Sequence, residues 1–200
     1  MINSSASKNN GVVNKHVFLI DDDEFIRANL STTLRDADYE VHTFSNPIEF
    51  LQADLTLSPA VILTDMVMPY MTGIELQAEL NKRSSFIPFV LMSGESSVSQ
   101  SVTAMKQGAI EFLVKPFEKS HLLEAIVRGH QIHARKIHVN NLLAKLTPRE
   151  REVFDMLIEG HGNSALVENL GISLPTAKQH KSEVMRKLDV KSLADLISLI

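Results

Sequence analysis

Cysteine is absent from this chain of 200 residues, so disulfide bonds and thiolate metal sites are both excluded. No apolar stretch approaches the roughly 18 residues that a transmembrane helix needs. The first 14 residues are polar and lack the apolar core of a secretion signal, so we expect a short disordered lead there. Together these absences predict a cytoplasmic protein that makes no use of a membrane.

A global excess of positive charge is missing as well. The net charge is −4, and residues 1–144 hold 12 Lys and Arg against 16 Asp and Glu. Residues 145–200 hold eight residues of each sign. Any contact of the second part with nucleic acid must therefore come from a local cluster of charge.

Five short apolar segments, each followed by a helical pattern, occupy the first part of the chain. Runs such as Val61-Ile62-Leu63 are typical of strands that are buried on both faces of a parallel sheet. Repeated strand–helix units predict an α/β fold with an open, doubly wound parallel sheet and right-handed crossovers. The expected strands are 16–20, 40–44, 61–64, 88–92 and 112–114, and the expected helices are 25–34, 47–51, 73–82, 98–107 and from 121 onward.

From Thr147 the apolar residues keep a helical spacing only. Thr147-Pro148-Arg149-Glu150 forms a capping box with proline at the first helical position, and predicts a helix to residue 159. Further helices are expected over 163–169, 173–187 and from 192, with Asn163, Ser173 and Ser192 as N-caps. The turn Gly171-Ile172-Ser173 between two short helices predicts a helix-turn-helix.

The domain boundaries follow from these patterns. We expect the lead over residues 1–14 and an α/β domain over 15–130. A helical linker should follow over 131–146, because apolar residues recur there while Gly129 and a polar cluster weaken the helix. A small helical domain should occupy 147–200.

Polar residues follow the ends of four expected strands. Parallel strands of an open sheet bind ligands beyond their carboxyl ends, so these side chains should meet in one crevice. Three carboxylates there would repel each other strongly, and Mg²⁺ relieves this because it prefers carboxylate, water and phosphate oxygens. Each residue also has a plainer alternative as a helix cap, a turn residue or a solvated lysine. The residues concerned are Asp21, Asp22, Asp65, Ser93 and Lys115.

This group of residues suits the formation of an aspartyl phosphate. A carboxylate attacks a phosphoryl group, while a cation and a lysine neutralise the phosphoryl oxygens. Asp65 ends a buried strand and is the expected acceptor, and Ser93 is expected to donate to the product. A phosphohydrolase would commonly need a second carboxylate two residues after the nucleophile, where this chain has Val67, so that class is disfavoured.

Residues 15 to about 130 resemble the receiver domain of two-component response regulators, which has the CheY-like fold. Residues 147–200 resemble the LuxR-type helix-turn-helix through Leu146-Thr-Pro-Arg-Glu-Arg-Glu-Val-Phe, Asn163, Leu170-Gly-Ile-Ser and Lys178-Gln-His-Lys. The combination is similar to the FixJ/NarL family of transcriptional regulators. That resemblance implies the strand order 2-1-3-4-5.

The resemblance also implies roles for single residues. Asp65 would accept the phosphoryl group, with Lys115 beside it and a cis peptide between Lys115 and Pro116. Ser93 and Phe112 would be the switch pair, although a plain core aromatic is the alternative for Phe112, which stands where tyrosine is frequent. Mg²⁺ would be held by Asp21, Asp22, Asp65 and the backbone carbonyl of Val67.

The helix expected over 173–187 presents polar and basic side chains between residues 176 and 187. On a helix docked in the major groove, some of these reach base edges while flanking basic ones contact phosphates. A solvated basic face is the alternative, and Ser164-Ala165-Leu166-Val167 departs from the usual family pattern. We assign Lys178, Gln179 and Ser182 to bases, and Lys181, Arg186 and Lys187 to phosphates.

The expected function is that of a transcriptional regulator switched by aspartyl phosphorylation, and not of an enzyme with an external substrate. The expected partners are a sensor histidine kinase, double-stranded promoter DNA, RNA polymerase, and a second copy of the chain after phosphorylation. The alternative is a receiver that acts as a protein-interaction module without phosphorylation. The eight histidines show no metal-ligand spacing, and we expect those at 130, 133 and 138 to be solvated.

Overall fold

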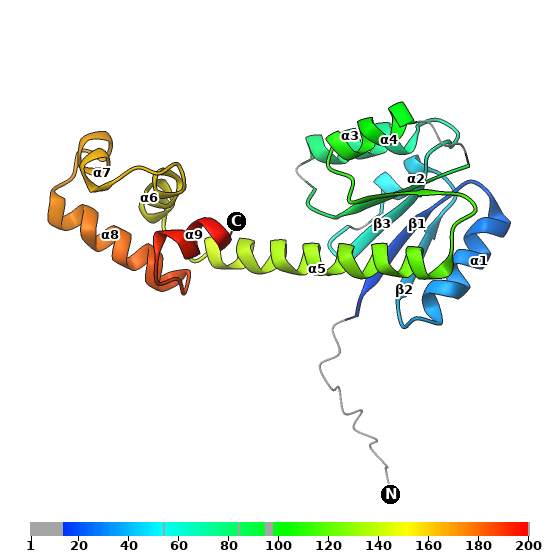
Figure 1. Cartoon of the computed structure of the whole chain (residues 1–200), viewed down its shortest axis with the longest axis horizontal. Coiled ribbons are helices and arrows are strands. Elements are labelled where there is room, and N and C mark those ends of the chain that lie inside the picture. Colours follow the sequence, from blue (N-terminus) through cyan, green and yellow to red (C-terminus); the bar gives the residue numbers. More distant parts are fainter. Residues whose placement is uncertain (1–13, 54, 84, 95–97, 200) are drawn as a thin grey trace, which may run out of the picture. The chain divides into compact units, whose positions relative to one another are not determined.

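The computed structural model describes residues 14–53, 55–83, 85–94 and 98–199 (Figure 1). The chain divides into two compact units, residues 1–134 and 135–200. Apart from Asn14, the lead expected over residues 1–14 lies outside the described residues. Among the residues that are described, no helix combines the length and the apolar character that would let it cross a membrane.

The first unit is a five-stranded sheet whose strands are all parallel, in the order β2-β1-β3-β4-β5. This confirms the predicted fold class and strand order. The observed ends of the elements differ from the sequence-based bounds by at most two residues, and β1, β2, α2 and α3 match them. The elements are β1 His16–Ile20, α1 Glu24–Arg35, β2 Glu40–Phe44, α2 Pro47–Leu51, β3 Ala60–Asp65, α3 Gly73–Lys82, β4 Phe89–Ser93, α4 Val98–Lys106, β5 Glu111–Val114 and α5 Lys119–Leu143.

Helices cover both faces of this sheet (Figure 1). Successive strand residues point to opposite faces of the sheet, so each strand contributes side chains to two separate cores. On one face Val17, Leu19 and Leu63 pack with Leu34 of α1 and Ile126 of α5. The opposite face packs against α2, α3 and α4 through residues that include Phe18, Ile62, Phe50, Leu76 and Ala104.

Local sequence signals explain where these helices begin. The Asn46 side chain accepts from the backbone N–H of Glu49, and Pro47 is the first residue of α2. Thr72 and Glu75 form a reciprocal capping box at the start of α3. These caps supply partners for backbone donors that a helix leaves unpaired in its first turn.

Gly129 permits a close approach between α5 and the sheet. A Cβ atom at this position would lie 2.7 Å from Cγ2 of Val61 on β3. The helix continues through Gly129 without a break, as Lys119–Leu143. The glycine therefore lets α5 pack tightly, whereas the sequence suggested only that it weakens the helix.

The second unit contains α6 Pro148–Ile158, α7 Asn163–Leu170, α8 Leu174–Lys187 and α9 Leu193–Leu199. Its core is separate and includes Val153, Phe154, Leu157, Leu166 and Val184. The predicted capping box at Thr147 and the cap at Ser173 are both present. Gly171 ends α7 in the left-handed conformation, with φ at 61°.

One local expectation was wrong. Asn163 is the first residue of α7 and makes no capping bond, because Gly162 occupies the N-cap position. In α1, Phe25 follows the first helical residue, Glu24, and its side chain is 87% exposed.

Candidate functional site

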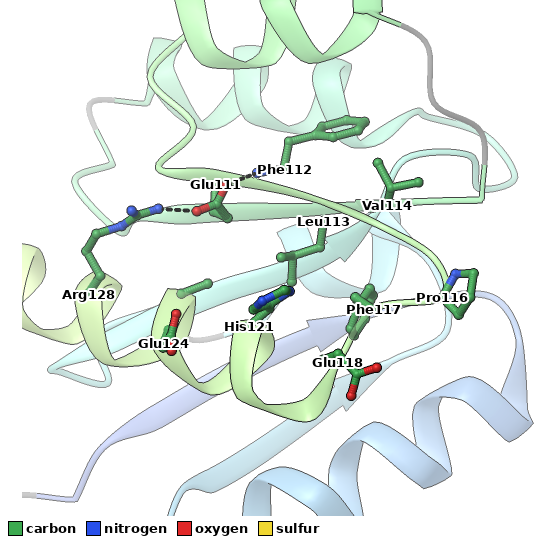
Figure 2. Close-up of a pocket in the computed structure, with 11 residues that line it drawn as sticks. Glu111, Phe112, Leu113, Val114, Pro116, Phe117, Glu118, His121, Glu124 and Arg128 are labelled. Carbon is green, nitrogen blue, oxygen red and sulfur yellow. Dashed lines mark hydrogen bonds and ion pairs between the residues drawn. The ribbon is translucent and has the colours of Figure 1, made fainter.

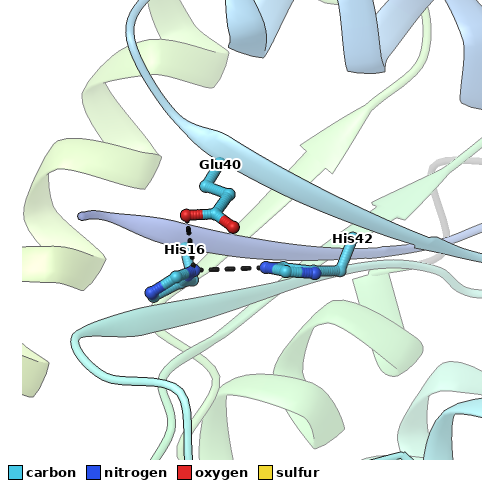
Figure 3. A group of neighbouring side chains, drawn as sticks. All are labelled: His16, Glu40 and His42. Carbon is cyan, nitrogen blue, oxygen red and sulfur yellow. Dashed lines mark hydrogen bonds and ion pairs between the residues drawn. The ribbon is translucent and has the colours of Figure 1, made fainter. Parts of the chain in front are cut away.

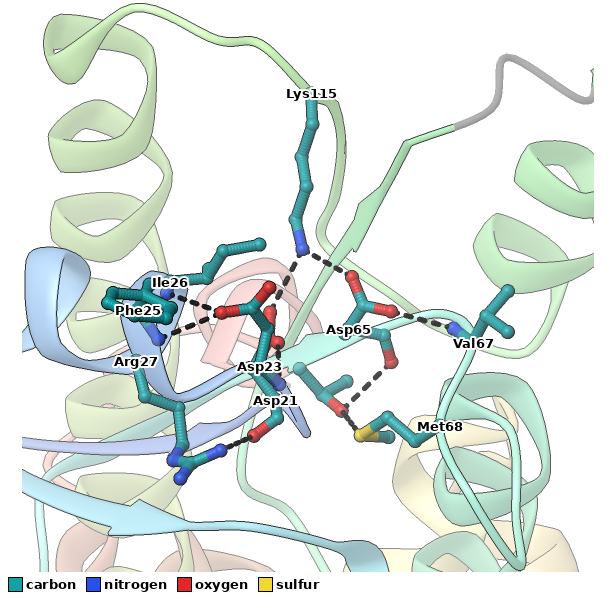
Figure 4. A network of polar contacts seen from close by, with 10 residues as sticks. Asp21, Asp23, Phe25, Ile26, Arg27, Asp65, Val67, Met68 and Lys115 are labelled. Carbon is teal, nitrogen blue, oxygen red and sulfur yellow. Dashed lines mark hydrogen bonds and ion pairs between the residues drawn. The ribbon is translucent and has the colours of Figure 1, made fainter.

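The carboxyl ends of β1, β3 and β5 bring three charged side chains together (Figure 4). Asp21 follows β1, Asp65 is the last residue of β3, and Lys115 follows β5. The Lys115 ammonium nitrogen lies 2.5 Å from Oδ1 of Asp65 and 2.9 Å from Oδ2 of Asp21. The peptide between Lys115 and Pro116 is cis, as the family resemblance implies. One cation thus bridges two carboxylates that belong to different strands.

Backbone groups fix the orientation of both carboxylates. Oδ2 of Asp65 accepts from the N–H of Val67 at 2.9 Å, and Oδ1 of Asp21 accepts from the N–H of Asp23 at 3.0 Å. Arg27 donates to the Asp21 carbonyl at 2.6 Å. The second oxygen of each carboxylate faces Lys115, so both are preorganised around one point.

Burial shapes the electrostatics of this site. Asp21 is 1% exposed and Asp65 is 9% exposed. Burial raises the pKa of Asp21 above its ordinary value, while the hydrogen bond from Lys115 offsets part of that rise. Burial alone would lower the pKa of Lys115, but its hydrogen bonds to Asp65 and Asp21 outweigh burial and raise that pKa. Lys115 is therefore held as a cation.

The remaining residues expected at this site lie around the charged group. Asp22 is exposed and Ser93, the last residue of β4, is 2% exposed. Phe112 lies on β5 with its ring partly buried against the core that faces α2, α3 and α4. The segment 95–97 that follows Gly94 lies outside the described residues.

The donors at these strand ends fit the chemistry of Mg²⁺. Receiver domains generally bind Mg²⁺ in an acidic pocket of this kind. Asp21, Asp22 and Asp65 supply only oxygen ligands, which is the preference of a small hard cation. Mg²⁺ usually keeps several waters, so it does not need all three carboxylates in direct contact.

Helix α8 carries the residues expected to meet DNA. Lys178, Gln179 and Ser182 are exposed, and Lys178 and Ser182 share a face through their spacing of four residues. Arg186 is exposed and pairs with Glu183 at 2.7 Å. Lys181 is partly exposed.

Lys187 differs from Arg186 because its ammonium group bonds to residues of the second unit that lie outside α8. It lies 2.6 Å from Oε2 of Glu150 and 3.2 Å from the carbonyl oxygen of Lys145. Glu150 is buried at the start of α6, and the bond from Lys187 helps to lower its pKa to about 2. This pair connects the end of α8 to the start of α6, which is a structural task that the sequence did not indicate.

The expectation that the histidines of α5 are solvated was wrong for two of them. His130 is 4% exposed and stacks on Tyr39, with ring centroids 5.2 Å apart. His133 is 7% exposed and its Nδ1 lies 2.8 Å from the Ala60 backbone nitrogen. His138 is exposed, as expected. Both corrections arise from the close packing of α5 on the sheet, which periodicity alone does not reveal.

Comparisons with known proteins match both units. Residues 17–127 match the response regulator receiver domain, and residues 144–200 match the bacterial regulatory proteins of the luxR family. The transcriptional regulatory protein FixJ of Azorhizobium caulinodans is 34% identical over 191 residues, which cover 92% of this chain and 90% of that protein.

Two solved structures are similar over nearly the same span. The structure of the response regulator StyR is 39% identical with a TM-score of 0.60, and the match covers 93% of this chain and 98% of that one. Full-length FixJ from B. japonicum is 34% identical with a TM-score of 0.55, and the match covers 92% and 94%. The likeness therefore extends over both units.

Proposed function

The chain belongs to the FixJ/NarL family of two-component response regulators, and from that premise we propose that phosphorylation of Asp65 controls the binding of its C-terminal unit to promoter DNA. The chain is a transcriptional regulator, with a receiver joined to a LuxR-type DNA-binding domain. The observation that carries the proposal is the bridge from Lys115 to Asp65 and Asp21 at the strand ends. We further propose that the receiver spans residues 15–130, a helical linker 131–146, and the DNA-binding domain 147–200.

The proposed reaction is a phosphoryl transfer to a carboxylate oxygen of Asp65. That oxygen attacks the phosphorus of a phosphohistidine, the P–N bond breaks, and the imidazole leaves with the electron pair and takes a proton from solvent. Lys115 already contacts Asp65 at 2.5 Å and stays available to neutralise a phosphoryl oxygen. Later hydrolysis of the acyl phosphate would reset the receiver.

The same pocket is proposed to bind Mg²⁺. Asp21, Asp22, Asp65 and the Val67 carbonyl would hold the ion, as the family resemblance implies. When bound, the ion would supply positive charge toward the equatorial oxygens of the transferred group. The burial of Asp21 supports this role, because a second cation would reduce the cost of keeping that carboxylate ionised.

Switching is proposed to proceed through Ser93 and Phe112. Ser93 would donate to the phosphoryl group, and Phe112 would turn further inward, which would alter the face formed by α4, β5 and α5. On this face Val102 and Met105 of α4 and Val127 of α5 are exposed apolar residues. We propose that two modified receivers pair there as a homodimer.

A cavity between β5 and α5 belongs to the same face (Figure 2). Phe112, Val114 and His121 are among its lining residues, and Arg128 closes one side through an ion pair with Glu111 at 2.5 Å. Ile110, just before β5, is partly buried against the core that faces α1 and α5. The side chain of Val98 lies outside the described residues.

Recognition of double-stranded promoter DNA is proposed for helix α8. The exposure of Lys178, Gln179 and Ser182 supports contacts to base edges, whereas Lys181 and Arg186 would contact phosphates. The ion pair with Glu150 makes Lys187 the weakest of the proposed phosphate contacts. RNA polymerase is a further proposed partner at the promoter.

The proposed phosphodonor is a sensor histidine kinase in the cytoplasm. Three large apolar side chains are exposed in the segments that carry the acidic residues, and exposed apolar surface marks sites of protein contact. Phe25 lies at the start of α1 just after Asp23, and Val67 and Tyr70 follow Asp65 in the loop before α3. These side chains would contact the kinase around the acceptor.

The direct test is intact-mass spectrometry after treatment with acetyl phosphate and Mg²⁺. The wild-type chain should gain one phosphoryl group, and Asp65→Asn should gain none because the amide is not a nucleophile at neutral pH. Asp36→Asn changes an exposed aspartate at the end of α1 and should behave like wild type. A full adduct on Asp65→Asn would move the acceptor elsewhere, and no adduct on any chain would favour a phosphorylation-independent interaction module.

A second test addresses the metal. Asp22→Ala should weaken Mg²⁺ binding and slow phosphorylation, because it removes an oxygen ligand without touching the buried pair. The affinity of the unmodified protein for DNA should stay unchanged. A Mg²⁺ titration with the wild-type midpoint would remove Asp22 from the proposed site.

A further inference from the structure

A second cluster of ligand-type side chains lies at the opposite end of the sheet from the acidic pocket (Figure 3). His16 is the first residue of β1, whereas Asp21 follows the last residue of that strand. Five residues of extended strand separate the two positions by roughly 16 Å. The cluster is formed by His16, Glu40 and His42, and it is independent of the phosphorylation chemistry proposed above.

Strand pairing fixes the position of all three residues. β1 and β2 are parallel, with His16 opposite Glu40 and Phe18 opposite His42. Because side chains alternate between the faces of a sheet, the residues at 16, 40 and 42 share one face. Register therefore holds two imidazoles and one carboxylate together without help from a flexible loop.

The distances between the ligand atoms are close to those around a small tetrahedral ion. Nδ1 of His16 lies 3.1 Å from Nε2 of His42 and 3.6 Å from Oε2 of Glu40. All three atoms lie within 4.8 Å of one another. Ligands at 2.0–2.2 Å from Zn²⁺ in tetrahedral geometry are about 3.3–3.6 Å apart.

Hydrogen bonds among these three side chains cannot satisfy all of their converging nitrogen and oxygen atoms at once. A neutral imidazole has one donor nitrogen and one acceptor nitrogen, and a carboxylate only accepts. If one nitrogen of the close histidine pair donates to the other, that proton is not available to Glu40. A metal ion would satisfy the three converging lone pairs at once.

We propose that His16, Glu40 and His42 form a zinc-binding site that joins β1 to β2. Two imidazoles with one carboxylate favour Zn²⁺ or a related transition metal over Mg²⁺ and Ca²⁺, which prefer oxygen ligands. His16 is buried, His42 is half-buried, and Glu40 is exposed on the edge strand of the sheet. The ion thus enters from the side of Glu40 and keeps water as its fourth ligand.

Neighbouring residues hold the proposed ligands in position. Asn14 donates from Nδ2 to Oε2 of Glu40 at 3.1 Å, which orients the carboxylate. The ring of His42 packs against His16 and Phe18, with centroid distances of 5.3 Å and 5.5 Å. Since the ion binds the folded pairing of β1 and β2, it stabilises the receiver unit by mass action.

The test is calorimetric titration of the untagged, metal-stripped full chain with Zn²⁺, in excess Mg²⁺ that fills the acidic pocket. One equivalent of Zn²⁺ should bind, and His42→Gln and Glu40→Gln should each weaken binding at least about 100-fold, whereas Asn14→Ala should weaken it about tenfold. His138→Gln removes an exposed histidine of α5 and should keep the wild-type affinity. Co²⁺ at the same site should give the intense visible bands of tetrahedral coordination.

Three results would bear against a zinc site at His16, Glu40 and His42. No Zn²⁺ binding by the wild-type chain, or wild-type affinity in both His42→Gln and Glu40→Gln, overturns the proposal. If His42→Gln unfolds, Glu40→Gln decides the outcome, because the Glu40 side chain is exposed and its replacement disturbs no core contact. Loss of binding in His138→Gln with retention in Glu40→Gln places the site elsewhere and also overturns it.

Discussion

The two units organise their charged residues in opposite ways. In the receiver, Lys115 contacts residues that are 50 and 94 positions away in the sequence, and both carboxylates are buried. In the second unit, the residues proposed to contact DNA lie within one helix, and most of them are exposed. The receiver site therefore exists only when the whole sheet is folded, whereas the DNA-binding surface depends on the exposure of one helix face.

This difference matches the chemistry proposed for each unit. Phosphoryl transfer needs opposed charges held at fixed distances in a partly desolvated pocket, where they act more strongly than in water. Contact with DNA instead needs side chains that remain accessible along a groove. Buried charge and exposed charge thus mark the two functions, and a regulator of this design has to connect them.

The largest expected effect separates the two cores. Phe154→Ala removes a fully buried ring from the second unit and should cost about 3–5 kcal/mol of its stability. That unit should lose DNA binding while Asp65 still accepts a phosphoryl group. Phe50→Ala, in the receiver core, should do the reverse. Thermal melts, mass spectrometry and fluorescence anisotropy on DNA measure this, and loss of both functions in either variant would mean that the units fold as one.

The next effect concerns the exception among the basic residues of α8. Lys187→Ala leaves the buried carboxylate of Glu150 without its cation and should destabilise the second unit by about 2–3 kcal/mol. The pair holds the pKa of Glu150 near 2, so its contribution is present above about pH 4.5 and is lost as the pH falls toward 2. Urea unfolding at pH 7 measures the loss, and the exposed Lys191→Ala is the matched control.

The same variant also tests the role of Lys187 in DNA binding. Removing a side chain that contacts phosphate reduces the slope of the logarithm of the binding constant against the logarithm of salt concentration by about one. Because the Lys187 ammonium is shared with Glu150, we expect Lys187→Ala to lower the slope by less than one unit once the folded fraction is accounted for. A fall of a full unit with unchanged stability would make Lys187 a full phosphate contact and contradict the structural role of its pair with Glu150.

Acid sensitivity should be built into the receiver through His130. Burial, with smaller contributions from Lys15, His133 and His16, lowers the pKa of His130 to about 4 from an ordinary value of 6.5. The unfolded chain binds this proton more readily, so stability is full above about pH 6.5 and declines as the pH falls toward 4. The decline between pH 7.5 and pH 5 should be about 2 kcal/mol.

His130→Phe should remove that part of the pH dependence, because the ring is kept and the titrating group is lost. His121→Phe, at an exposed position of the same helix, should retain it. Urea unfolding at the two pH values gives the comparison. An equal loss of stability in His130→Phe and wild type would show that His130 is not the titrating group.

The smallest expected effect concerns base recognition. Lys178→Ala should weaken binding to the operator by about 1 kcal/mol or more and relax the preference at one base pair. Lys181→Ala should weaken operator and random DNA alike. Anisotropy titrations on both DNAs test this. If Lys178→Ala loses as much affinity for random DNA as for the operator, as Lys181→Ala should, the assignment of Lys178 to a base is wrong.

Most of the fold could be predicted because its signals are local. Buried strands such as Val61-Ile62-Leu63, the capping box at Thr147, and Gly171 each depend on neighbouring residues. Residues that follow consecutive parallel strands meet at one edge by topology alone, which is why the acidic site could be anticipated. The family resemblance added the strand order and the roles of individual residues.

The features that were missed depend on contacts between distant segments. The burial of His130 requires α5 to pack on the sheet so that the His130 ring stacks on Tyr39. The pair of Lys187 with Glu150 requires the end of α8 to meet the start of α6. The cluster of His16, Glu40 and His42 depends on the register of β1 against β2. No spacing along the sequence encodes these distances.

The central claim is that phosphorylation of the receiver controls DNA binding by pairing two chains. Pairing would hold two α8 helices together and raise the avidity for paired half-sites by about 10²–10⁴-fold. A closed two-fold dimer would favour an inverted-repeat operator. Ser93→Ala should break the link, leaving Asp65 able to accept a phosphoryl group without driving dimerisation.

Sedimentation velocity with and without beryllofluoride and Mg²⁺ tests this claim most directly. We predict a mainly monomeric protein that becomes a dimer when the phosphoryl mimic is added, and no change in Asp65→Asn or Ser93→Ala. The same oligomeric state of the wild-type chain under both conditions would contradict the claim, and would point instead to a rearrangement within a standing assembly.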